Sequence, residues 1–526
     1  MKILVADSVP GRAIEILKAE PSWNVVNLPE TRGQLAKEIR DADALLVRSA
    51  TKVTAEVLDQ AERLVVIGRA GVGVDNIDLD AATRKGVLVM NTPGGNSVSV
   101  AEHTMALLLA MAHPVAQADA TMKQGKWEKK KFTGSELRGK TLGLIGLGTI
   151  GTEVARLAQA HKMNVIAYDP YVSAVLATEQ NIRLLSLDEL LRASDFISLH
   201  CTLTPETEHL INAKSLAMTR PGVRLVNCAR GELVDERALL AALESGHVAG
   251  AGLDVFESEP PTDQKLARHP SVIATPHIAG STEEAQQVVG TRIAEQLRDY
   301  LLTGAVRNAV NMPSVTPEEF KKLQPYLELG EKLGSFVVQL ADKPVEEVSI
   351  SYDGGLADMN THLVKNAVLK GVLRQILAES VNLINAGNFA KARGIEVVEV
   401  RSARRAGYAN SLGVALRTSG GPSTVLGVVN VNKALRILGV NNIDIEAPLK
   451  GNLLLIRNQD VPGVIGRIGT LLGQHQVNIA NFALGRMQGS QEAIGIINVD
   501  QVVPPEVLVE LRAFPAIQQA RTIEIR

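Results

Sequence analysis

The fold is decided by the stretch Leu142-Gly143-Leu144-Ile145-Gly146-Leu147-Gly148-Thr149-Ile150-Gly151, in which a short apolar run passes into spaced glycines. The apolar part predicts a strand, and Thr152–His161 and Val165–Tyr168 predict the helix and strand that follow it. Glycines at these spacings permit a tight turn, a close approach of the backbone to a pyrophosphate, and close packing of helix on strand. The stretch therefore predicts a doubly wound α/β unit that binds a dinucleotide.

The residues around this turn favour NAD over NADP as the dinucleotide. The pyrophosphate is expected at the helix N-terminus, where unpaired amides and the positive end of the dipole lie. The backbone residues expected to hold it are Gly146, Gly148, Thr149, Ile150 and Gly151. Asp169 follows the second strand, 23 positions after Gly146, and can accept hydrogen bonds from both ribose hydroxyls, whereas a 2′-phosphate would meet its negative charge. The alternative, a doubly wound domain without a nucleotide, stays open.

The composition is that of a globular protein and argues against several classes. The 526 residues predict about three or four domains. The formal net charge of -2 gives no excess of positive charge for nucleic acid or an anionic membrane, and Lys129–Lys131 is expected to be a solvated turn. The apolar run Met105–Ala112 is much shorter than the roughly 20 residues of a membrane span. Cys201 and Cys228 are too few for a disulfide framework or a metal site, and we expect a cytoplasmic protein without a metal.

Short β-branched runs alternate with helical stretches up to about residue 305, which predicts parallel sheets that are buried on both faces. The runs are Lys2–Ala6, Ala44–Val47, Leu64–Ile67, Thr141–Ile145, Val165–Tyr168, Phe196–Leu199, Arg224–Asn227 and Val272–Thr275. Because the glycine turn comes late, the residues before it are expected to form a separate lobe. Helices at Ser99–Gln124 and Glu283–Thr303 are expected to cross between two lobes and to leave a cleft. The predicted division is a substrate-binding lobe of residues 1–98 and 284–312 and a nucleotide-binding lobe of residues 99–283.

The second half of the chain predicts two further domains. Prolines interrupt the chain after residue 313, and residues 313–448 are predicted to form an intervening α+β domain with a helix at Asn360–Ala386 and a strand-rich stretch at Ser411–Val431. Residues 452–526 predict the ferredoxin-like order of strand, helix, strand, strand, helix, strand. The strands are Asn452–Arg457, Ile479–Arg486, Glu492–Val499 and Arg521–Ile525, and the helices are Val464–His475 and Pro505–Ala513.

Three candidate catalytic residues follow successive strands of the nucleotide-binding lobe. Ligands of open α/β sheets bind beyond the carboxyl ends of the strands, where Arg230, Glu259 and His277 are expected. Together they suit the oxidation of a hydroxy acid, with a histidine base, an arginine for the carboxylate and an acid that orients the base. Taken singly, each has a simpler interpretation: a structural histidine, a surface ion pair or a solvated loop acid.

The chain resembles the D-isomer-specific 2-hydroxyacid dehydrogenases in these stretches. The shared motifs are Gly143–Gly151, Asn227–Gly231, Leu253–Pro261 and Thr275–Gly280. The resemblance implies that Arg230 binds the substrate carboxylate, and that Glu259 pairs with His277, the acid/base. It also implies that Asp254 contacts the nicotinamide end. The residues implied to line the cofactor are Cys201, Cys228, Ala229, Ala279 and Gly280.

The first lobe resembles that of the family members that oxidise 3-phosphoglycerate. Arg48 and Arg69 each follow a short strand and could face the cleft to hold a phosphate, although pairing with local acids is the simpler alternative. The Gly71–Gly73 turn could offer amides to a carboxylate. The expected substrate residues are Arg48, Ser49, Arg69, Gly71, Val72, Gly73 and Asn76. A glyoxylate or hydroxypyruvate reductase of the same family, or an NAD-sensing binding protein without catalysis, remains an alternative.

The C-terminal residues 452–526 resemble an ACT domain, a small ligand-sensing module. The resemblance implies that L-serine binds as an effector at Asn458, Asp460 and Asn478, whose acid and amides suit an amino acid. The family also implies a homotetramer. In the intervening domain, Arg401, Arg404 and Arg405 could hold an anion, but a solvated surface is the simpler interpretation.

Overall fold

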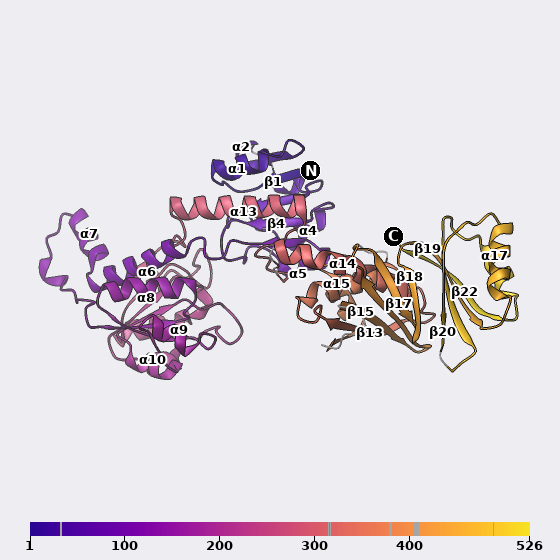
Figure 1. Ribbon diagram of the computed structural model, residues 1–526. Helices are drawn as coiled ribbons and strands as arrows, with labels where there is room; N and C mark the ends of the chain where they lie inside the picture. The colour runs from indigo at the N-terminus through magenta and orange to yellow at the C-terminus, as the bar shows by residue number, and fades with distance from the viewer. Residues whose placement is uncertain are drawn as a thin grey trace.

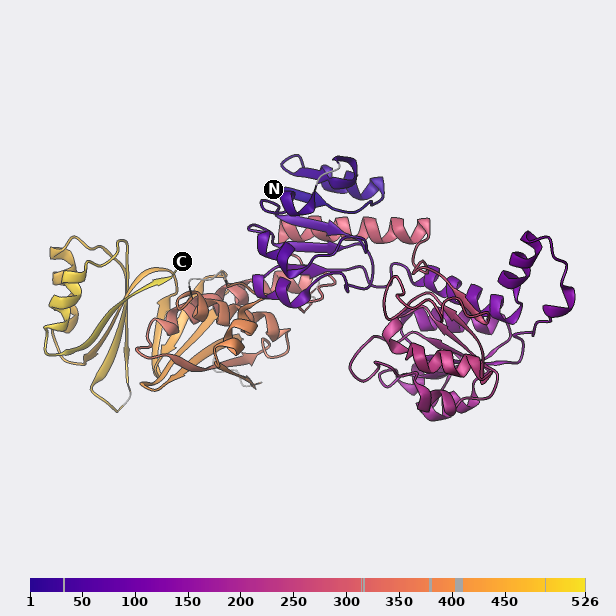
Figure 2. The same ribbon diagram turned by 180° about the vertical axis from the view of Figure 1, so that it is seen from behind.

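The computed structural model describes residues 1–31, 34–313, 315, 317–377, 381–402, 410–487 and 489–525. These residues form four sheets in an elongated molecule. The second sheet lies at one end, the first sheet beside it, then the third, with the C-terminal sheet at the other end (Figures 1 and 2). The first two sheets are parallel, the third is mixed and the fourth is antiparallel. The predicted α/β class, with two doubly wound lobes and two further α+β units, is confirmed.

The first lobe is a five-stranded parallel sheet in the order β2-β1-β3-β4-β5. Its strands are β1 (Lys2–Val5), β2 (Asn24–Asn27), β3 (Ala44–Val47), β4 (Val66–Arg69) and β5 (Leu88–Met90). Its helices are α1 (Gly11–Lys18), α2 (Leu28–Thr31), α3 (Leu35–Glu38), α4 (Ala55–Gln60), α5 (Leu79–Lys85) and α13 (Glu283–Thr303). A Cβ on Gly68 of β4 would lie 2.7 Å from Ile293 and 2.9 Å from Leu297, so α13 packs directly on the sheet. The late helix α13 therefore completes the core of the N-terminal lobe.

The second lobe is a seven-stranded parallel sheet in the order β12-β11-β10-β9-β6-β7-β8. Its strands are β6 (Thr141–Ile145), β7 (Asn164–Tyr168), β8 (Arg183–Leu184), β9 (Phe196–Leu199), β10 (Val223–Asn227), β11 (Val248–Leu253) and β12 (Val272–Ala274). Its further helices are α8 (Thr149–Ala160), α9 (Ala174–Glu179), α10 (Leu187–Ala193), α11 (Ala213–Ala217) and α12 (Glu236–Glu244). The strand order reverses between β6 and β9, which is the position where doubly wound sheets bind ligands.

The single helix predicted at Ser99–Gln124 is wrong, because the structure has two helices there. These are α6 (Ser97–Ala112) and α7 (Val115–Lys123), bent by 69° at the break between them. Pro114 cannot continue a helix, and His113 before it is extended, as a residue preceding proline prefers. Figure 1 shows α7 at the outer tip of the second lobe. Among the described residues, no single helix is long and apolar enough to cross a membrane. The bent pair α6–α7 meets these criteria of length and composition only when its two helices are taken together.

The intervening domain is a six-stranded mixed sheet in the order β14-β13-β15-β16-β17-β18. Its strands are β13 (Val345–Gly354), β14 (Glu396–Ser402), β15 (Asn410–Thr418), β16 (Gly421–Val429), β17 (Leu435–Val440) and β18 (Ile443–Pro448). Its helices are α14 (Pro317–Val338), α15 (Thr361–Arg374) and α16 (Ala386–Ala392). The stretch predicted as strand-rich is the β15–β16 hairpin, as the pairing of Thr418 with Gly421 shows.

The helix predicted at Asn360–Ala386 ends earlier, at Arg374. Asparagine side chains explain part of the difference, because Asn385 Oδ1 accepts from the Asn382 amide at 2.7 Å and gives the backbone an alternative to the helix. The Asn382 side-chain amide also donates to Gly86 O at 2.8 Å, and Asn385 donates to Arg84 O at 3.2 Å. The intervening domain is thereby docked on the end of α5 in the first lobe.

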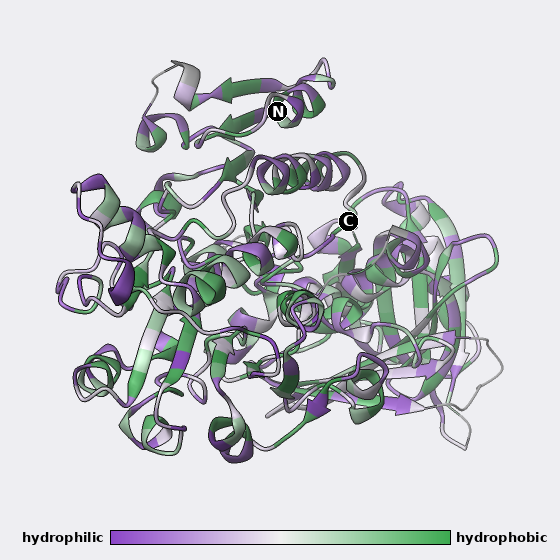
Figure 3. Cartoon of the chain, turned by 90° about the vertical axis from the view of Figure 1, so that its left-hand side faces the viewer, coloured by the Kyte–Doolittle hydropathy of each residue, from purple (hydrophilic) through white to green (hydrophobic). Residues whose placement is uncertain are grey.

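The C-terminal domain is a four-stranded antiparallel sheet in the order β20-β21-β19-β22, as the ferredoxin-like prediction required. Its elements are β19 (Gly451–Gln459), α17 (Val464–Gln474), β20 (Ile479–Arg486), β21 (Glu492–Val499), α18 (Pro505–Arg512) and β22 (Ile517–Ile525). A Cβ on Gly485 of β20 would lie 2.4 Å from Asp444 O of β18, so this sheet packs closely on the intervening domain. Many strands carry predominantly hydrophobic residues, as the colouring in Figure 3 shows.

Replacing Gly371 by alanine is expected to destabilise the intervening domain. Gly371 lies in α15, and a Cβ there would lie 1.9 Å from Glu331 O in the backbone of α14. The two helices would have to separate, at a cost of about 1–3 kcal/mol in the free energy of unfolding. The matched control is Gly469→Ala in α17, where no atom lies within 4 Å of the added Cβ and alanine favours the helix by roughly 0.5–1 kcal/mol. Hydrogen exchange of α14 and α15 peptides measures the difference. Equal protection in both variants would contradict the close packing.

Candidate active site

The three glycines of the turn after β6 serve different physical purposes. Gly146 has φ +98, and a Cβ there would lie 2.6 Å from the His200 carbonyl carbon, so the turn requires glycine. A Cβ on Gly151 would lie 2.2 Å from Gly146 O, so α8 packs against the turn itself. Gly148 has no atom within 4 Å of its would-be Cβ, so its side is open to an approaching ligand. A tight turn, close helix packing and an open side for the ligand are the three roles that glycines have in a dinucleotide-binding turn.

The N-terminus of α8 and Asp169 complete the groups that fit a dinucleotide. No side chain caps α8 at Gly148, which leaves the amides of Thr149 and Ile150 at an uncapped, positive helix end. Asp169 Oδ2 accepts from the Leu147 amide at 2.8 Å, so the carboxylate lies beside the turn, and its Oδ1 accepts from the Tyr171 amide at 2.9 Å. Both oxygens retain lone pairs that could receive ribose hydroxyls.

The two cysteines expected along the cofactor follow β9 and β10. Burial raises the pKa of Cys201 to about 11 and the pKa of Cys228 to about 12, so both thiols remain protonated at neutral pH. Protonated, buried thiols are poor nucleophiles. If these residues line a cofactor, they do so by packing rather than by reaction.

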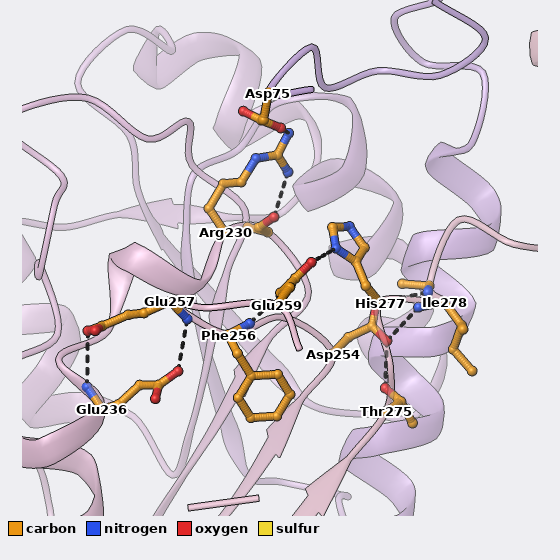
Figure 4. Close-up of polar contacts among 12 residues, drawn as sticks. Asp75, Arg230, Glu236, Asp254, Phe256, Glu257, Glu259, Thr275, His277 and Ile278 are labelled. Atoms are coloured by element: carbon orange, nitrogen blue, oxygen red, sulfur yellow. Dashed lines mark hydrogen bonds and ion pairs between the residues drawn. The ribbon is translucent and has the colours of Figure 1, made fainter. Parts of the chain in front are cut away.

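The imidazole of His277 and the carboxylate of Glu259 form a close pair at the end of β12 (Figure 4). Nδ1 lies 2.7 Å from Oε2, and Oε1 accepts from the Phe256 amide at 3.2 Å. The hydrogen bond to Glu259 raises the pKa of His277 above its usual value, although burial pulls it down. Burial raises the pKa of Glu259, but the hydrogen bond and the charge of His277 outweigh it and leave that pKa lowered. The pair therefore stabilises the protonated form of His277 relative to the same imidazole without a carboxylate partner.

A buried carboxylate, Asp254, fixes the loop that carries His277. Asp254 is 0% exposed, and its backbone oxygen accepts from the His277 amide at 2.8 Å. Its Oδ1 accepts from Thr275 Oγ1 at 2.6 Å and from the Ile278 amide at 2.9 Å. Its Oδ2 accepts from the Ala279 amide at 2.8 Å. His277 itself has φ +52, and this network holds it in that left-handed conformation.

Two further residues of this network have no role in the sequence-based prediction. His103 of α6 has Nε2 3.0 Å from Thr275 Oγ1 and 3.5 Å from Asp254 Oδ1. Ser99, on the same helix, donates to Ala279 O at 2.6 Å. The crossing helix α6 therefore supports the loop that carries the histidine. Sequence gives no signal for the Thr275 and Ala279 contacts, because 172 and 180 positions separate the partners.

Arg230 follows β10 and contacts the first lobe. Its Nη2 lies 2.9 Å from Oδ2 of Asp75 in the loop between β4 and α5, and its Nη1 donates to Ala229 O at 2.6 Å (Figure 4). The structure thus brings Arg230, Glu259 and His277 to the same carboxyl edge of the second sheet, as the sequence predicted. Asp75 is a partner that the sequence did not predict.

Two arginines of the first lobe add positive charge near Arg230. Burial, together with the charges of Arg230 and Arg48, lowers the pKa of Arg69 to about 10. Arg69 Nε is buried and has no hydrogen-bond partner among the described residues. The Arg48 loop is shaped by Asp7, which accepts from the Arg48 amide at 2.6 Å and from Thr51 Oγ1 at 2.7 Å. A cation with an unpartnered buried nitrogen, beside two other cations, is an arrangement suited to an anionic ligand.

Some of the remaining substrate candidates are hydrogen-bonded within the first lobe, whereas others have amides that donate to no described residue. The Gly71 amide donates to Thr92 Oγ1 at 2.9 Å, and Asn76 Nδ2 donates to Arg48 O at 2.8 Å and to Thr51 O at 2.7 Å, so these groups hold the loops in place. The amides of Val72 and Gly73 donate to none of the described residues. Ser49 is exposed at the edge of this site.

The three effector candidates do not converge within one chain. Asn458 pairs with Ala493 on β21, and Asp460 lies just beyond it, with Oδ2 3.0 Å from Arg486 Nε. Asn478 precedes β20, whose first residue pairs with Val499 at the other end of β21. Asn478 donates to Asp500 Oδ2 at 2.6 Å. A site that uses all three would therefore need a second copy of the domain.

Of the three basic residues noted in the intervening domain, the structure describes Arg401. Arg401 donates to Thr361 Oγ1 at 2.7 Å, while Arg404 and Arg405 lie outside the described residues. Lys129–Lys131 forms a short 3-10 turn in which Lys131 pairs with Glu128 at 2.8 Å.

Comparison with known proteins agrees with this arrangement. The family model of the D-isomer specific 2-hydroxyacid dehydrogenase NAD binding domain matches residues 105–279. The D-3-phosphoglycerate dehydrogenase of Methanocaldococcus jannaschii is 44% identical over 100% of both chains. This chain belongs to the D-3-phosphoglycerate dehydrogenase family. The enzyme of that name from Bacillus subtilis is 40% identical over 100% of this chain and 99% of its own.

The second half of the chain matches the same family. Models of the D-3-phosphoglycerate dehydrogenase intervening domain and of the ACT domain match residues 322–441 and 452–516. Among solved structures, a D-lactate dehydrogenase from Aquifex aeolicus complexed with NAD and lactic acid is 33% identical, with a TM-score of 0.52, over 60% of this chain and 100% of that chain. A protein of Thermus thermophilus, TT0316, is 37% identical, with a TM-score of 0.53, over 59% of this chain and 100% of that chain.

Replacing Glu259 by glutamine is expected to lower the pKa of His277. The amide keeps the shape of the carboxylate but removes the charge that stabilises the imidazolium, while the burial of His277 remains. NMR titration of histidine-labelled protein measures the change. The control is Glu257→Gln, which removes a carboxylate 2.9 Å from His209 and should leave the His277 titration in place. An unchanged His277 pKa in the Glu259 variant would show that the pair is not coupled.

Proposed function

We propose that this protein oxidises 3-phospho-D-glycerate with NAD to 3-phosphohydroxypyruvate, the first step of phosphorylated L-serine biosynthesis. The observation that carries the proposal is the meeting of the Glu259–His277 pair and Arg230 at the carboxyl edge of the second sheet, which also bears the glycine turn. The full-length relatives named D-3-phosphoglycerate dehydrogenase support the same substrate. The low cysteine count suits a cytoplasmic enzyme.

The residues at this edge can perform each step that the oxidation needs. Arg230 binds the substrate carboxylate and fixes its orientation. His277 accepts the proton of the substrate hydroxyl, and the charge of Glu259 stabilises the imidazolium that results. The glycine turn and Asp169 would hold NAD, which would supply the acceptor for the hydride. Because His277 must be neutral to accept a proton, the oxidation is expected to accelerate as the pH rises through its raised pKa.

The cofactor assignment depends on residues that fit NAD. The open side of Gly148, the uncapped start of α8 and the placement of Asp169 beside Leu147 suit a pyrophosphate and an unphosphorylated ribose. Asp254, which follows β11 and fixes the loop after β12, would contact the nicotinamide end. Cys201, Cys228, Ala229, Ala279 and Gly280 would line the remainder of the site.

The charge of the first lobe favours a phosphorylated acid over an unphosphorylated one. A phosphate ester carries about −1.5 to −2 at neutral pH in addition to the carboxylate. Arg48 and Arg69, together with Arg230, supply positive charge for both groups, and the free amides of Val72 and Gly73 can assist the carboxylate. A glyoxylate or hydroxypyruvate reductase would have no phosphate for Arg48 and Arg69 to bind.

We further propose a homotetramer regulated by L-serine at the ACT domain. Asn458 and Asp460 lie at one end of the C-terminal sheet and Asn478 at the other, so a serine site would be shared between copies. In the second lobe, α7 and its following turn expose Val115, Met122 and Trp127, the last at 80%, which suits contact with another copy. We also propose four domains, with limits at residues 1–98 together with 284–312, 99–283, 313–448 and 452–526.

Initial rates of NADH formation test the substrate. We expect kcat/KM for 3-phospho-D-glycerate to exceed that for D-glycerate by about 10²-fold or more, because leaving a buried charge without its partner costs roughly 2–5 kcal/mol. L-serine is expected to lower the rate, while L-alanine at the same concentration serves as the effector control. Equal kcat/KM for the two acids would favour the reductase alternative. The absence of turnover on either acid would favour a non-catalytic NAD-binding protein.

Replacing His277 by alanine is expected to remove turnover while NAD still binds. Loss of the general base should lower kcat by about 10²–10⁴-fold. His209→Ala is the control, because His209 also pairs with a glutamate of the second lobe, 2.9 Å away, but follows β9 rather than β12. Stopped-flow rates and NAD titration by fluorescence measure the two effects. Near-normal turnover in the His277 variant would refute its role as the base.

A further inference from the structure

The loop between β4 and α5 places an acidic side chain on the residue proposed to hold the substrate carboxylate. Asp75 Oδ2 lies 2.9 Å from Arg230 Nη2, and the Asp75 side chain is 72% exposed. A Cβ on Gly73 would lie 2.1 Å from Arg230 Nη2 and 2.8 Å from Asp75 Oδ2. Both charged groups therefore lie against the turn whose Val72 and Gly73 amides are free among the described residues.

Asp75 is one of two acids near the clustered cations Arg48, Arg69 and Arg230. Arg69 is influenced by the positive charges of Arg230 and Arg48 and by the negative charges of Asp75 and Asp7. The Asp7 carboxylate is hydrogen-bonded within the Arg48 loop, because its oxygens accept from backbone amides and from a threonine hydroxyl there. Asp75, by contrast, has one described ion pair and is otherwise open to solvent.

The Asp75–Arg230 ion pair also connects the two lobes. Among the residues that the structure describes, no other ion pair joins the first lobe to the second. It uses one nitrogen of the Arg230 fork, and the other, Nη1, donates to Ala229 O at 2.6 Å. A single contact from an exposed carboxylate is a weak interaction that another anion can readily replace.

We propose that Asp75 is an internal stand-in for the substrate carboxylate: it competes with that carboxylate for Arg230 and is displaced when a substrate binds. The inference rests on the proposed role of Arg230 as the carboxylate-binding residue. Asp75 then acts as a specificity-determining residue, because an incoming anion must compete with it for the guanidinium. An acid that carries both a carboxylate and a phosphate competes better than a small monoanion, since it engages Arg48 and Arg69 at the same time.

The alternative is that Asp75 braces Arg230 in the orientation that the substrate needs. The two roles predict opposite results when the charge is removed. A brace that is lost would weaken substrate binding, whereas a competitor that is lost would strengthen it. The direction of the change in KM therefore separates the two roles.

The experiment compares the unaltered protein with Asp75→Asn, which keeps the size of the side chain and removes its charge. We expect KM for 3-phospho-D-glycerate to fall about two- to fivefold and kcat/KM to rise, which corresponds to the loss of a weak competing pair. Asp59→Asn, which removes an exposed carboxylate from α4 of the same lobe, is the matched control and should leave KM within the error of the measurement. A raised KM, or the same KM in both variants, would overturn the proposal.

A second measurement separates this inference from the proposed substrate. Calorimetric titration with oxalate in the presence of NADH reports anion binding without turnover, so it applies even if 3-phosphoglycerate is not oxidised. Tighter oxalate binding by Asp75→Asn than by the unaltered protein and by Asp59→Asn is the expected result. Equal or weaker binding would overturn the proposal, as would the absence of measurable oxalate binding in all three proteins.

Discussion

The buried carboxylate of Asp254 is the constraint on which the site depends. It is fully enclosed, and its oxygens satisfy a hydroxyl and two amides of the loop that follows β12. Those bonds hold His277 at a positive φ, from which its imidazole reaches Glu259. Without them a histidine would have little reason to remain in that conformation, and the distance to the carboxylate would not be fixed.

The two lobes contribute complementary parts of the chemistry. The second lobe carries the Glu259–His277 pair and the open glycine turn at one edge of its sheet. The first lobe supplies positive charge from Arg48 and Arg69, on loops that Asp7 and Asn76 tie together. Arg230 of the second lobe and Asp75 of the first form an ion pair between the lobes.

The two C-terminal domains are connected to the site through packing rather than through catalytic residues. Asn382 and Asn385 bind carbonyl oxygens at the end of α5, whose other end follows the loop that carries Asp75 and Asn76. The ACT-domain sheet in turn packs on β18 of the intervening domain, closely enough to require glycine at 485. Contacts therefore run without interruption from the C-terminal sheet to the substrate loop.

Local sequence pattern was enough to predict the elements and the residues at the strand ends, whereas the contacts between distant groups depend on how the elements pack. The glycine turn, Asp169 and the three residues after β10, β11 and β12 could be predicted because parallel strands end at one edge, whatever the distances along the chain. The Arg230–Asp75 pair and the support of Thr275 by His103 join residues that local pattern cannot relate. The separation of Asn478 from Asn458 likewise depends on strand register, which sets them at opposite ends of a sheet. Such contacts follow from the relative placement of packed elements, and that placement is fixed by the whole core and not by any one stretch of sequence.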